Sequence, residues 1–390
     1  MISNTQRKAL WLGLAVVAVA ATAATGALAA SNDSTATAQA RTRTLTDMPN
    51  DISGPQVHFL YIVPSDGADA QLDTNEGMEQ SIARIERWLV TQTGNQGLRI
   101  DTRNGVPDIG FMRLPHSDAQ AAATLYGPQW VMGEDLRAAG FNDPAKVYAV
   151  IYGGHGSLTC GYATSPAVPK LAAAYLQEGT TKGASLCREV PGYGPGTNRA
   201  GFFETVLLHE IMHTIGFTPL CAPHASKSDF PNHVNDSSHD LMYGPDPTHP
   251  GLWDWAHAVL DFNHDDYYRA NVPGCPDLSE SPYLQAIPSF NLTVTIRGHG
   301  SVDTLIDNTS PKRCGAACTY SALRSSVMTL SAIPAAGSRF VAWSGGCSGK
   351  GDCQLTMAGP TSVTATFSPK PKPKCRKGQK STKKYPCVRR

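Results

Sequence analysis

The sequence predicts an α+β protein in which a mixed sheet carrying two helices is followed by a small all-β domain. From residue 56 onward, strand-like apolar runs alternate with segments of helical periodicity, and this order is typical of a sheet covered by helices on one face. From residue 289 onward, the pattern changes to short stretches of alternating apolar and polar residues between Gly, Pro and Ser turns. A chain of 390 residues is also long enough for two domains.

The first domain is expected to span residues 56–288. It begins with the apolar run VHFLYIV, whose β-branched and aromatic residues predict a buried strand. Residues 75–90 predict a helix, because four apolar side chains share one helical stripe: Met78, Ile82, Ile85 and Leu89. Three strand-like runs follow, LRIDT, DIGFMRLP and KVYAVIYGG, and then a second apolar helix that should stop at Gly216. The segment from there to Pro288 is dense in Pro, Gly, Asn, Asp and His, which predicts long ordered loops of the kind that carry function.

The all-β domain is expected to span residues 289–369. Its strand-like segments are NLTVTIRGHGSV, SSVMTLSAIP, SRFVAWSGGC and TSVTATFSP. They predict a small antiparallel domain in which Phe340 and Trp343 belong to the core rather than to a binding surface.

The N-terminal residues indicate export. Residues 1–29 contain Arg7 and Lys8, a 16-residue apolar run and the small residues ALA at their end, which is typical of a cleaved secretory signal peptide. That run is shorter than the roughly 20 residues of a transmembrane helix, and no later segment is long enough, so we expect no transmembrane segment after cleavage. Residues 30–55, rich in Ser, Thr, Ala and Asp, predict a flexible leader.

The other end of the chain is strongly basic. Residues 370–390 contain seven Lys, three Arg and no acidic residue, so this tail carries +10 although the formal net charge of the whole chain is +1. A basic tail attracts anionic polymers in a salt-sensitive way. Tyr385 is its single aromatic residue, which argues against stacking on bases, so we expect an anionic cell-envelope polymer as partner and no specific nucleic acid. A tail that is simply solvated is the alternative.

Ten cysteines in an exported chain predict disulfides, and none of them stands in the C-x-x-C spacing of a structural zinc ribbon. Proximity in the sequence suggests five pairs: Cys160–Cys187, Cys221–Cys275, Cys314–Cys318, Cys347–Cys353 and Cys375–Cys387.

The chemistry of the chain is concentrated in LLHEIMHTIGF, residues 207–217. Residues four apart on a helix stand one above the other, so His209 and His213 can bind one ion, and imidazole nitrogen is a preferred zinc ligand. Glu210 lies beside the first histidine, where its carboxylate can accept a proton from a water activated by the zinc ion. The remaining side chains of this helix are apolar, and an unpaired charge among them would cost several kcal/mol, which argues against a chance match.

This motif resembles the signature of the zincin family of zinc metallopeptidases, and H-E-x-x-H-x-x-G matches the first eight positions of the metzincin form. HDLMYG, from His239 to Gly244, resembles the metzincin Met-turn, which implies that Met242 packs below the zinc ion and that Tyr243 lies near the oxyanion. The position where metzincins place their third histidine holds Pro219, which has no donor atom, and this departure leaves the third ligand open.

The third ligand should come from the loop between Gly216 and Met242. NHVNDSSHDLMYG resembles a run in secreted bacterial proteins of this type, and that likeness favours His233. The other candidates are His224, Asp236, His239 and Asp240. DFNHDDYY, residues 261–268, could bind calcium or orient the site, or could be a solvated turn.

The segment from residue 291 to residue 369 resembles the bacterial repeat domain related to the internalin B repeat, through MTLSAIPAAGSRFVAWSGGC and the closing SVTATF. That likeness implies a spacer or adhesive unit on an exported or surface protein.

The sequence therefore predicts a secreted, disulfide-bonded zinc metalloendopeptidase that acts on a protein or peptide substrate. Association with the cell wall or the cell surface is the alternative to free secretion. Glu210 is the expected general base, and His209, His213 and His233 are the expected Zn²⁺ ligands. The alternative is a catalytically inactive zincin-like surface adhesin or cell-envelope-binding protein, an alternative that Pro219 keeps open.

Overall fold

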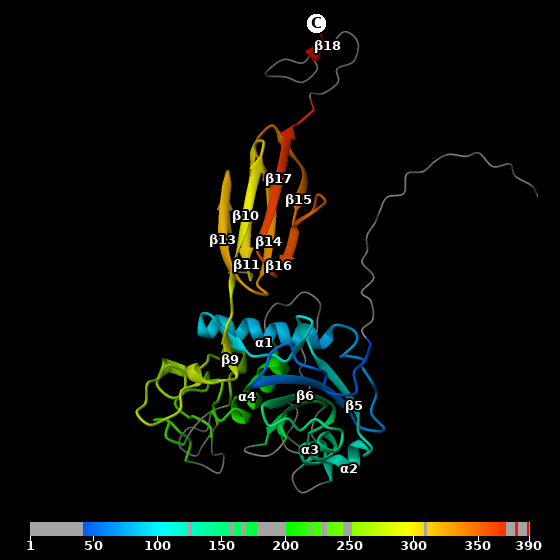
Figure 1. Ribbon diagram of the computed structural model, residues 1–390. Helices are drawn as coiled ribbons and strands as arrows, with labels where there is room; N and C mark the ends of the chain where they lie inside the picture. Colours follow the sequence, from blue (N-terminus) through cyan, green and yellow to red (C-terminus); the bar gives the residue numbers. More distant parts are fainter. Residues whose placement is uncertain are drawn as a thin grey trace, which may run out of the picture. The chain divides into compact units, whose positions relative to one another are not determined.

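The protein has a mixed α and β architecture in which strands predominate, and its C-terminal part is all β (Figure 1). The computed structural model describes residues 42–123, 127–156, 159–164, 169–177, 200–217, 220–227, 232–244, 252–307 and 310–371, together with the backbone of two short paired strands, Gln379–Lys380 (β18) and Val388–Arg389 (β19). The predicted α+β class is confirmed at this level. The predicted signal peptide lies outside the described residues.

A five-stranded sheet organises the first part of the chain, in the order β5-β1-β6-β8-β7. Strands β5, β1, β6 and β8 run parallel, and β7 pairs antiparallel with β8 at the edge. The sheet is therefore mixed, as predicted. Its strands are β1 (Gln56–Val63), β5 (Ile109–Arg113), β6 (Lys146–His155), β7 (Gly161–Ala163) and β8 (Lys170–Gln177).

Helices cover both faces of this sheet, which corrects the prediction of helices on one face only (Figure 1). Helices α1 (Gly77–Thr93) and α4 (Phe202–Thr214) share a core with one face, while α2 (Asp118–Ala122) and α3 (Pro128–Ala138) lie against the other. The prediction missed α2 and α3. The sequence of β1 indicates that both faces of the sheet are covered. All eight residues of this strand are buried, and a strand with two buried faces has a continuous apolar sequence.

The predicted apolar stripe of α1 is confirmed. Its four members are almost completely buried in the core shared with α4: Met78, Ile82, Ile85 and Leu89. The helix ends where Gly94 adopts a φ of 85° and donates its N–H to the carbonyl of Val90. A left-handed residue at this position is a common helix stop, and glycine adopts it without steric cost.

Two predictions about strands need correction. LRIDT does not form a full strand of the main sheet, although Ile100 makes a single parallel bridge with Val57 of β1. Its first residue ends β2 (Gln96–Leu98), which pairs with β9 (Leu284–Ala286), and its last begins β3 (Thr102–Arg103), which pairs with β4 (Val106–Pro107). The sheet instead gains β7 and β8, which the sequence analysis did not identify, because β8 is rich in alanine and alanine has little preference for strands.

Residues 42–55, predicted to be a flexible leader, are instead held on the first sheet region. Arg43 makes ion pairs of 2.7 Å with Asp69 and Asp73. Thr44 forms a bridge with Gly110 of β5, and the Thr44 hydroxyl donates to the carbonyl of Ile109. Composition does not reveal paired charges and backbone bonding of this kind, so a segment rich in small polar residues predicts a flexible leader.

The all-β part contains two four-stranded sheets, in the orders β13-β10-β17-β15 and β12-β11-β14-β16, around a core that includes Trp343. Trp343 is 3% exposed, and Phe340 packs against the same core, as predicted. The sequence predicts an antiparallel domain, but β10 and β17 pair in parallel, so this prediction is only partly correct. Its strands are β10 (Ser289–Arg297), β11 (Gly300–Ile306), β12 (Lys312–Cys314), β13 (Ala317–Leu323), β14 (Val327–Pro334), β15 (Ser338–Gly345), β16 (Cys353–Thr356) and β17 (Thr361–Pro369).

Three of the predicted disulfides are present in the structure: Cys221–Cys275, Cys314–Cys318 and Cys347–Cys353. The predicted pairs Cys160–Cys187 and Cys375–Cys387 lie partly or wholly outside the described residues. The disulfides are compatible with an extracellular protein. Among the described helices, none has the length and apolar character needed to cross a membrane.

Candidate metal centre

Helix α4 carries the predicted chemistry and is buried almost throughout. A helix that is apolar on all sides is stable only inside a protein, which explains its place between the sheet and the loops that follow it. At its C-terminal end, Gly216 has a φ of 94° and donates its N–H to the carbonyl of His213, while the N–H of Phe217 reaches the carbonyl of Met212. This is the Schellman arrangement, so Gly216 terminates the helix as predicted.

The first turn of α4 is tied to α1 by the buried side chain of Glu204. Its carboxylate accepts hydrogen bonds from the Gly201 N–H at 2.9 Å, from the Ser81 hydroxyl at 2.9 Å and from Arg84 Nη1 at 3.1 Å. The negative charge lies at the positive end of the helix dipole and has an arginine partner. These contacts fix the position of the helix that bears the histidines.

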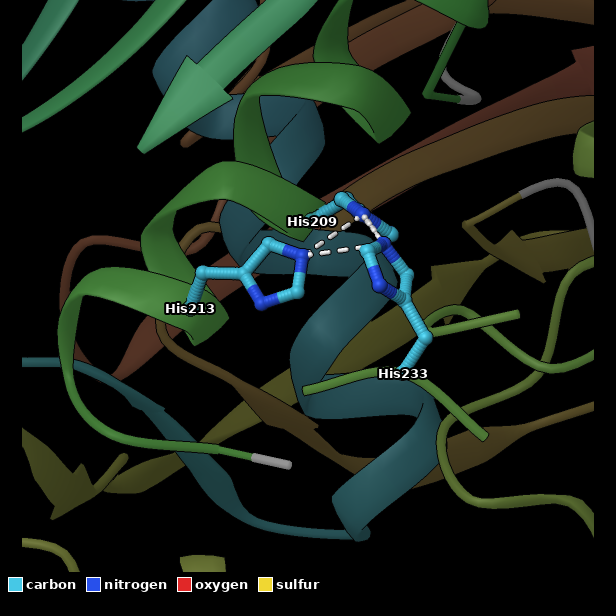
Figure 2. A group of neighbouring side chains, drawn as sticks. All are labelled: His209, His213 and His233. Carbon is cyan, nitrogen blue, oxygen red and sulfur yellow. Dashed lines mark hydrogen bonds between the residues drawn. The ribbon is translucent and has the colours of Figure 1, made fainter. Parts of the chain in front are cut away.

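Three histidine rings converge at the end of α4 (Figure 2). The Nε2 atoms of His209 and His213 are 3.0 Å apart, and each lies 3.2 Å from Nε2 of His233, which comes from a separate segment of the loop region. Two nitrogens bound to one tetrahedral zinc ion, at about 2.0 to 2.1 Å each, would lie about 3.4 Å apart. The spacing of the three nitrogens is therefore close to that of ligands on a single ion.

Hydrogen bonding among the three rings cannot by itself explain this convergence. Each nitrogen of a neutral imidazole carries either one hydrogen or one lone pair, so three nitrogens facing one point can form at most one linear hydrogen bond. Burial lowers the pKa of His209 to about 3, with a further contribution from His233, and burial followed by the two neighbouring rings keeps the pKa of His213 well below its usual range. His209 and His213 are therefore neutral at physiological pH, and a neutral imidazole nitrogen that carries a lone pair suits a cation.

His209 is oriented from the far side of its ring. Its Nδ1 donates to the backbone carbonyl of Leu241 at 2.6 Å, which leaves a lone pair on Nε2. A carbonyl in this position is the usual outer partner of a metal-binding histidine, because it sets both the tautomer and the ring orientation. Leu241 belongs to the segment HDLMYG, which turns so that the N–H of Tyr243 donates to the carbonyl of Asp240. Met242 and Tyr243 are buried beside the site, and the identification of this turn with a Met-turn stays a prediction.

His233 is carried by a short segment that is hydrogen-bonded on both sides. Its carbonyl accepts from the N–H of Ser226 at 2.7 Å, and the N–H of the next residue, Val234, donates to the carbonyl of Met242 at 3.0 Å. Gly244 passes so close to the His233 ring that an added Cβ would lie 2.6 Å from its Cγ. The backbone on each side therefore defines where this imidazole can point.

Glu210 lies next to the histidines and faces the edge strand β7. A Cβ added at Gly161 would lie 2.7 Å from Oε1 of Glu210, so the absence of a side chain there leaves room for the carboxylate. Burial raises the pKa of Glu210 to about 8, and the carboxylate therefore needs a nearby positive charge to be ionised at neutral pH. A metal ion held by the three imidazoles would supply that charge.

The other candidates for a third ligand lie elsewhere. His224 and Asp236 belong to a second cluster with Asp265 and Asp266. His239 is partly exposed and forms an ion pair of 3.2 Å with Asp254, and Asp240 is buried and accepts from the hydroxyl of Tyr267. Of the five residues considered, the structure brings His233 to His209 and His213. Pro219, which occupies the position of the third metzincin histidine, lies outside the described residues.

Three contributors to this centre are not among the residues predicted from the sequence. Gly161 makes space for Glu210, the Leu241 carbonyl orients His209, and the ring of Trp253 lies 5.3 Å from that of His209, centroid to centroid. Neither a glycine in a short strand nor a backbone carbonyl leaves a recognisable pattern in a single sequence. Trp253 could have been noticed as an aromatic residue in a loop rich in His and Asp.

Comparisons with known proteins identify the C-terminal region and little else. Residues 290–371 match the family described as a divergent InlB B-repeat domain, which agrees with the predicted repeat. No curated protein matches this chain.

Among solved structures, the chain is similar to catalytically inactive OgpA from Akkermansia muciniphila in complex with an O-glycopeptide (glycodrosocin) substrate, with 10% identity and a TM-score of 0.28 over 86% of this chain and 99% of that one. It is also similar to wild-type OgpA from the same organism, with 12% identity and a TM-score of 0.30 over 84% and 98% of the two chains. Likenesses at this TM-score do not establish a shared fold.

Proposed function

We propose that the protein is a secreted zinc-dependent peptidase in which His209, His213 and His233 hold Zn²⁺ and Glu210 is the general base. The observation that carries the proposal is the convergence of three imidazole nitrogens at 3.0 to 3.2 Å from one another, with a carboxylate on the residue next to His209. Three histidines form a donor set used by catalytic zinc sites, which keep a fourth position for water or substrate.

The residues of the chain fit zinc for a chemical reason. Imidazole is a borderline ligand that suits zinc, and neutral rings leave the double charge of the ion uncancelled. When bound, zinc lowers the pKa of a coordinated water and polarises a substrate carbonyl. The outer hydrogen bond from His209 to the carbonyl of Leu241 holds its ring in the orientation that such a ligand requires.

Glu210 has the proton-transfer role in this proposal. Its carboxylate is held in a buried position one residue from His209, where it accepts a proton from the attacking water and passes that proton to the leaving amine. The apolar surroundings keep bulk water away from the carboxylate, and Gly161 keeps the space beside it open.

The edge of the main sheet supports a peptide as the substrate class. Within the described part of the chain, β7 pairs with β8 on one side, and it is the outermost strand of the sheet order. An extended peptide can add to an unpaired strand edge through its backbone N–H and carbonyl groups. A peptide bound along β7 would pass close to Gly161 and therefore to Glu210.

The proposal is tested by Glu210→Gln, which keeps the shape of the side chain and removes its basicity. We expect about one zinc ion per chain in both proteins, and a rate of cleavage of an unfolded protein that falls by at least about 100-fold in the variant. The matched control is Glu134→Gln, a change at an exposed position of α3 that should leave the rate unchanged. Undiminished cleavage by Glu210→Gln would rule out this mechanism, and zinc binding without cleavage by the unmodified protein would favour the inactive adhesin.

A further inference from the structure

A second group of ligand-type side chains lies apart from the three histidines. It consists of His224, Asp236, Asp265 and Asp266, and one donor atom from each lies within 4.8 Å of the others. Two atoms that bind one Ca²⁺ ion at about 2.4 Å can be at most about 4.8 Å apart. The four donor atoms are therefore close enough to share a single ion.

The buried carboxylate of Asp236 is the strongest reason to expect a ligand in this cluster. Both of its oxygens are hidden from solvent, and neither accepts a hydrogen bond of normal geometry from the described residues. Oδ1 of Asp265 is also hidden from solvent, and no described residue donates a hydrogen bond to it. Buried carboxylate oxygens are costly unless they are paired or bind a metal.

Charge balance in this cluster differs from that in the other acidic cluster of the protein. There, Asp47 and Asp101 surround Lys146, whose ammonium lies 2.7 Å from Oδ2 of Asp101, so a side chain of the protein already supplies the cation. In the cluster around Asp236, the ion-pair partner of Asp265 and Asp266 within the described chain is His224, whose Nδ1 lies 3.9 Å from Asp265 and 3.2 Å from Asp266. Three carboxylates thus share one imidazole.

We propose that His224, Asp236, Asp265 and Asp266 form a second cation site, which takes a divalent ion of the oxygen-preferring class to which Ca²⁺ and Mn²⁺ belong. Three carboxylates are the ligands that such ions favour, and Mn²⁺ also accepts an imidazole nitrogen. The side chains of His224 and Asp265 are 41% and 44% exposed, which gives an ion a route from solvent.

The site would fasten together the segments that position His233, and this consequence rests on the proposed function. The N–H of His224 donates to Oδ1 of Asp266 at 2.7 Å, and the carbonyl of His224 accepts from the N–H of Asn235 at 3.1 Å. Asp236 follows His233 by three residues. An ion bound by Asp236 and Asp266 would therefore join the His233 segment to residues 261–268, close to the disulfide that links Cys221 with Cys275.

The test measures binding on the full chain after its zinc site has been filled with one equivalent of Zn²⁺. Ca²⁺ and Mn²⁺ are then titrated separately by calorimetry, and the melting temperature is measured with and without each ion. We expect at least one of the two ions to bind at about one per chain and to raise the melting temperature. In Asp236→Asn the affinity should fall by at least about 10-fold, whereas the control Glu134→Gln should bind as the unmodified protein does.

The melting temperature of Asp236→Asn without the ion shows whether the variant binds less tightly because it has lost its fold. Asp236→Asn removes a buried charge that is repelled by Asp265, so the ion-free variant should melt at the same temperature as the unmodified protein or higher. His224→Asn should weaken the binding of Mn²⁺, and an unchanged affinity would remove His224 from the site. Absence of saturable binding of both ions, or equal affinity in Asp236→Asn, overturns the proposal. Because the readouts are binding and melting, they do not depend on peptidase activity.

Discussion

Gly161 shows how a single missing side chain shapes the centre. In Gly161→Ala the added Cβ would lie 2.7 Å from Oε1 of Glu210 and 2.7 Å from a methyl group of Val206, so the carboxylate must move. A misplacement of about 1 Å at a reacting group can lower a rate by about 100-fold, and we expect cleavage to fall by about 10- to 100-fold. Zinc content, measured by metal analysis, should stay the same because no imidazole is displaced.

The matched control for that change is Gly133→Ala. Gly133 lies in α3, and a Cβ at this position would meet nothing within 4 Å. Alanine in a helix is more stable than glycine by about 0.5 to 1 kcal/mol, so this variant should be slightly more stable and fully active. Equal activity of the two glycine variants would show that Glu210 does not need the space beside Gly161.

Asp240 should give the protein a stability that depends on pH. Its carboxyl group is fully buried, and burial raises its pKa to about 7 although it accepts hydrogen bonds from the N–H groups of Phe262 and Met242. In the unfolded chain the pKa of an aspartate is about 3.9. Between these two values the folded protein binds more protons than the unfolded chain, so this group stabilises the fold below about pH 4, and its contribution is lost as the pH rises through about 7.

The measurement compares the unmodified protein with Asp240→Asn, which stays neutral at every pH. We expect the free energy of unfolding of the unmodified protein, relative to the variant, to fall by about 1.4 kcal/mol for each pH unit between about pH 4 and pH 7. Urea unfolding at a series of pH values gives this difference, and effects common to both proteins cancel. A difference that does not change with pH would mean that Asp240 is ionised in the folded state throughout that range.

At the scale of elements, local sequence determines helix α4 but does not determine the conformation of the loops that follow it. The bounds and burial of α4 follow from a continuous apolar run and from Gly216, both of which are local features. The place of His233 does not, because it depends on hydrogen bonds to Ser226 and Met242, which are seven residues before it and nine after it. Such bonds form only when the loop is folded against the rest of the molecule. Local sequence pattern therefore does not identify His233, and only the resemblance of its segment to secreted bacterial proteins of this type favoured it.

Helices α2 and α3, which were not predicted, also show the limits of local sequence pattern. Helix α2 has five residues and α3 has eleven, and both are short for a periodicity to be recognised. The capping box at Ser117 and Gln120 and the proline at the start of α3 were local signals of their beginnings. Their position on the second face of the sheet follows from the buried side chains of that face, which need a cover.

At the scale of the whole molecule, we propose that the mixed α/β part ends after residue 288 and that it folds without the all-β part. The apolar cores of the two parts are made of different residues. The last strand of the first part, β9, pairs with β2, and the N–H of Ile287 donates to the carbonyl of Asn95. A chain that stops at Pro288 keeps these contacts, whereas a chain that stops at Ser281 loses them.

Two truncated proteins test this boundary. The chain ending at Pro288 should unfold cooperatively and bind about one zinc ion, because every residue of the candidate centre precedes the cut. The chain ending at Ser281 loses Tyr283 and Leu284, which are 6% and 7% exposed, and should be less stable by roughly 3 to 6 kcal/mol. Urea unfolding and metal analysis measure both quantities, and equal stability of the two truncated proteins would contradict a boundary after residue 288.

The sequence by itself determined the fold class, the helix that carries His209, Glu210 and His213, the apolar stripe of α1 and three cysteine pairs. Each of these rests on short-range pattern: the spacing of apolar residues, the spacing of the two histidines, or cysteines near one another in the chain. The tertiary structure alone decided that His233 completes the group, that Gly161 stands beside Glu210 and that His224 and Asp236 form a separate cluster with Asp265 and Asp266. These juxtapositions join segments far apart in the sequence, and loop backbones adopt them only through bonds to the packed core.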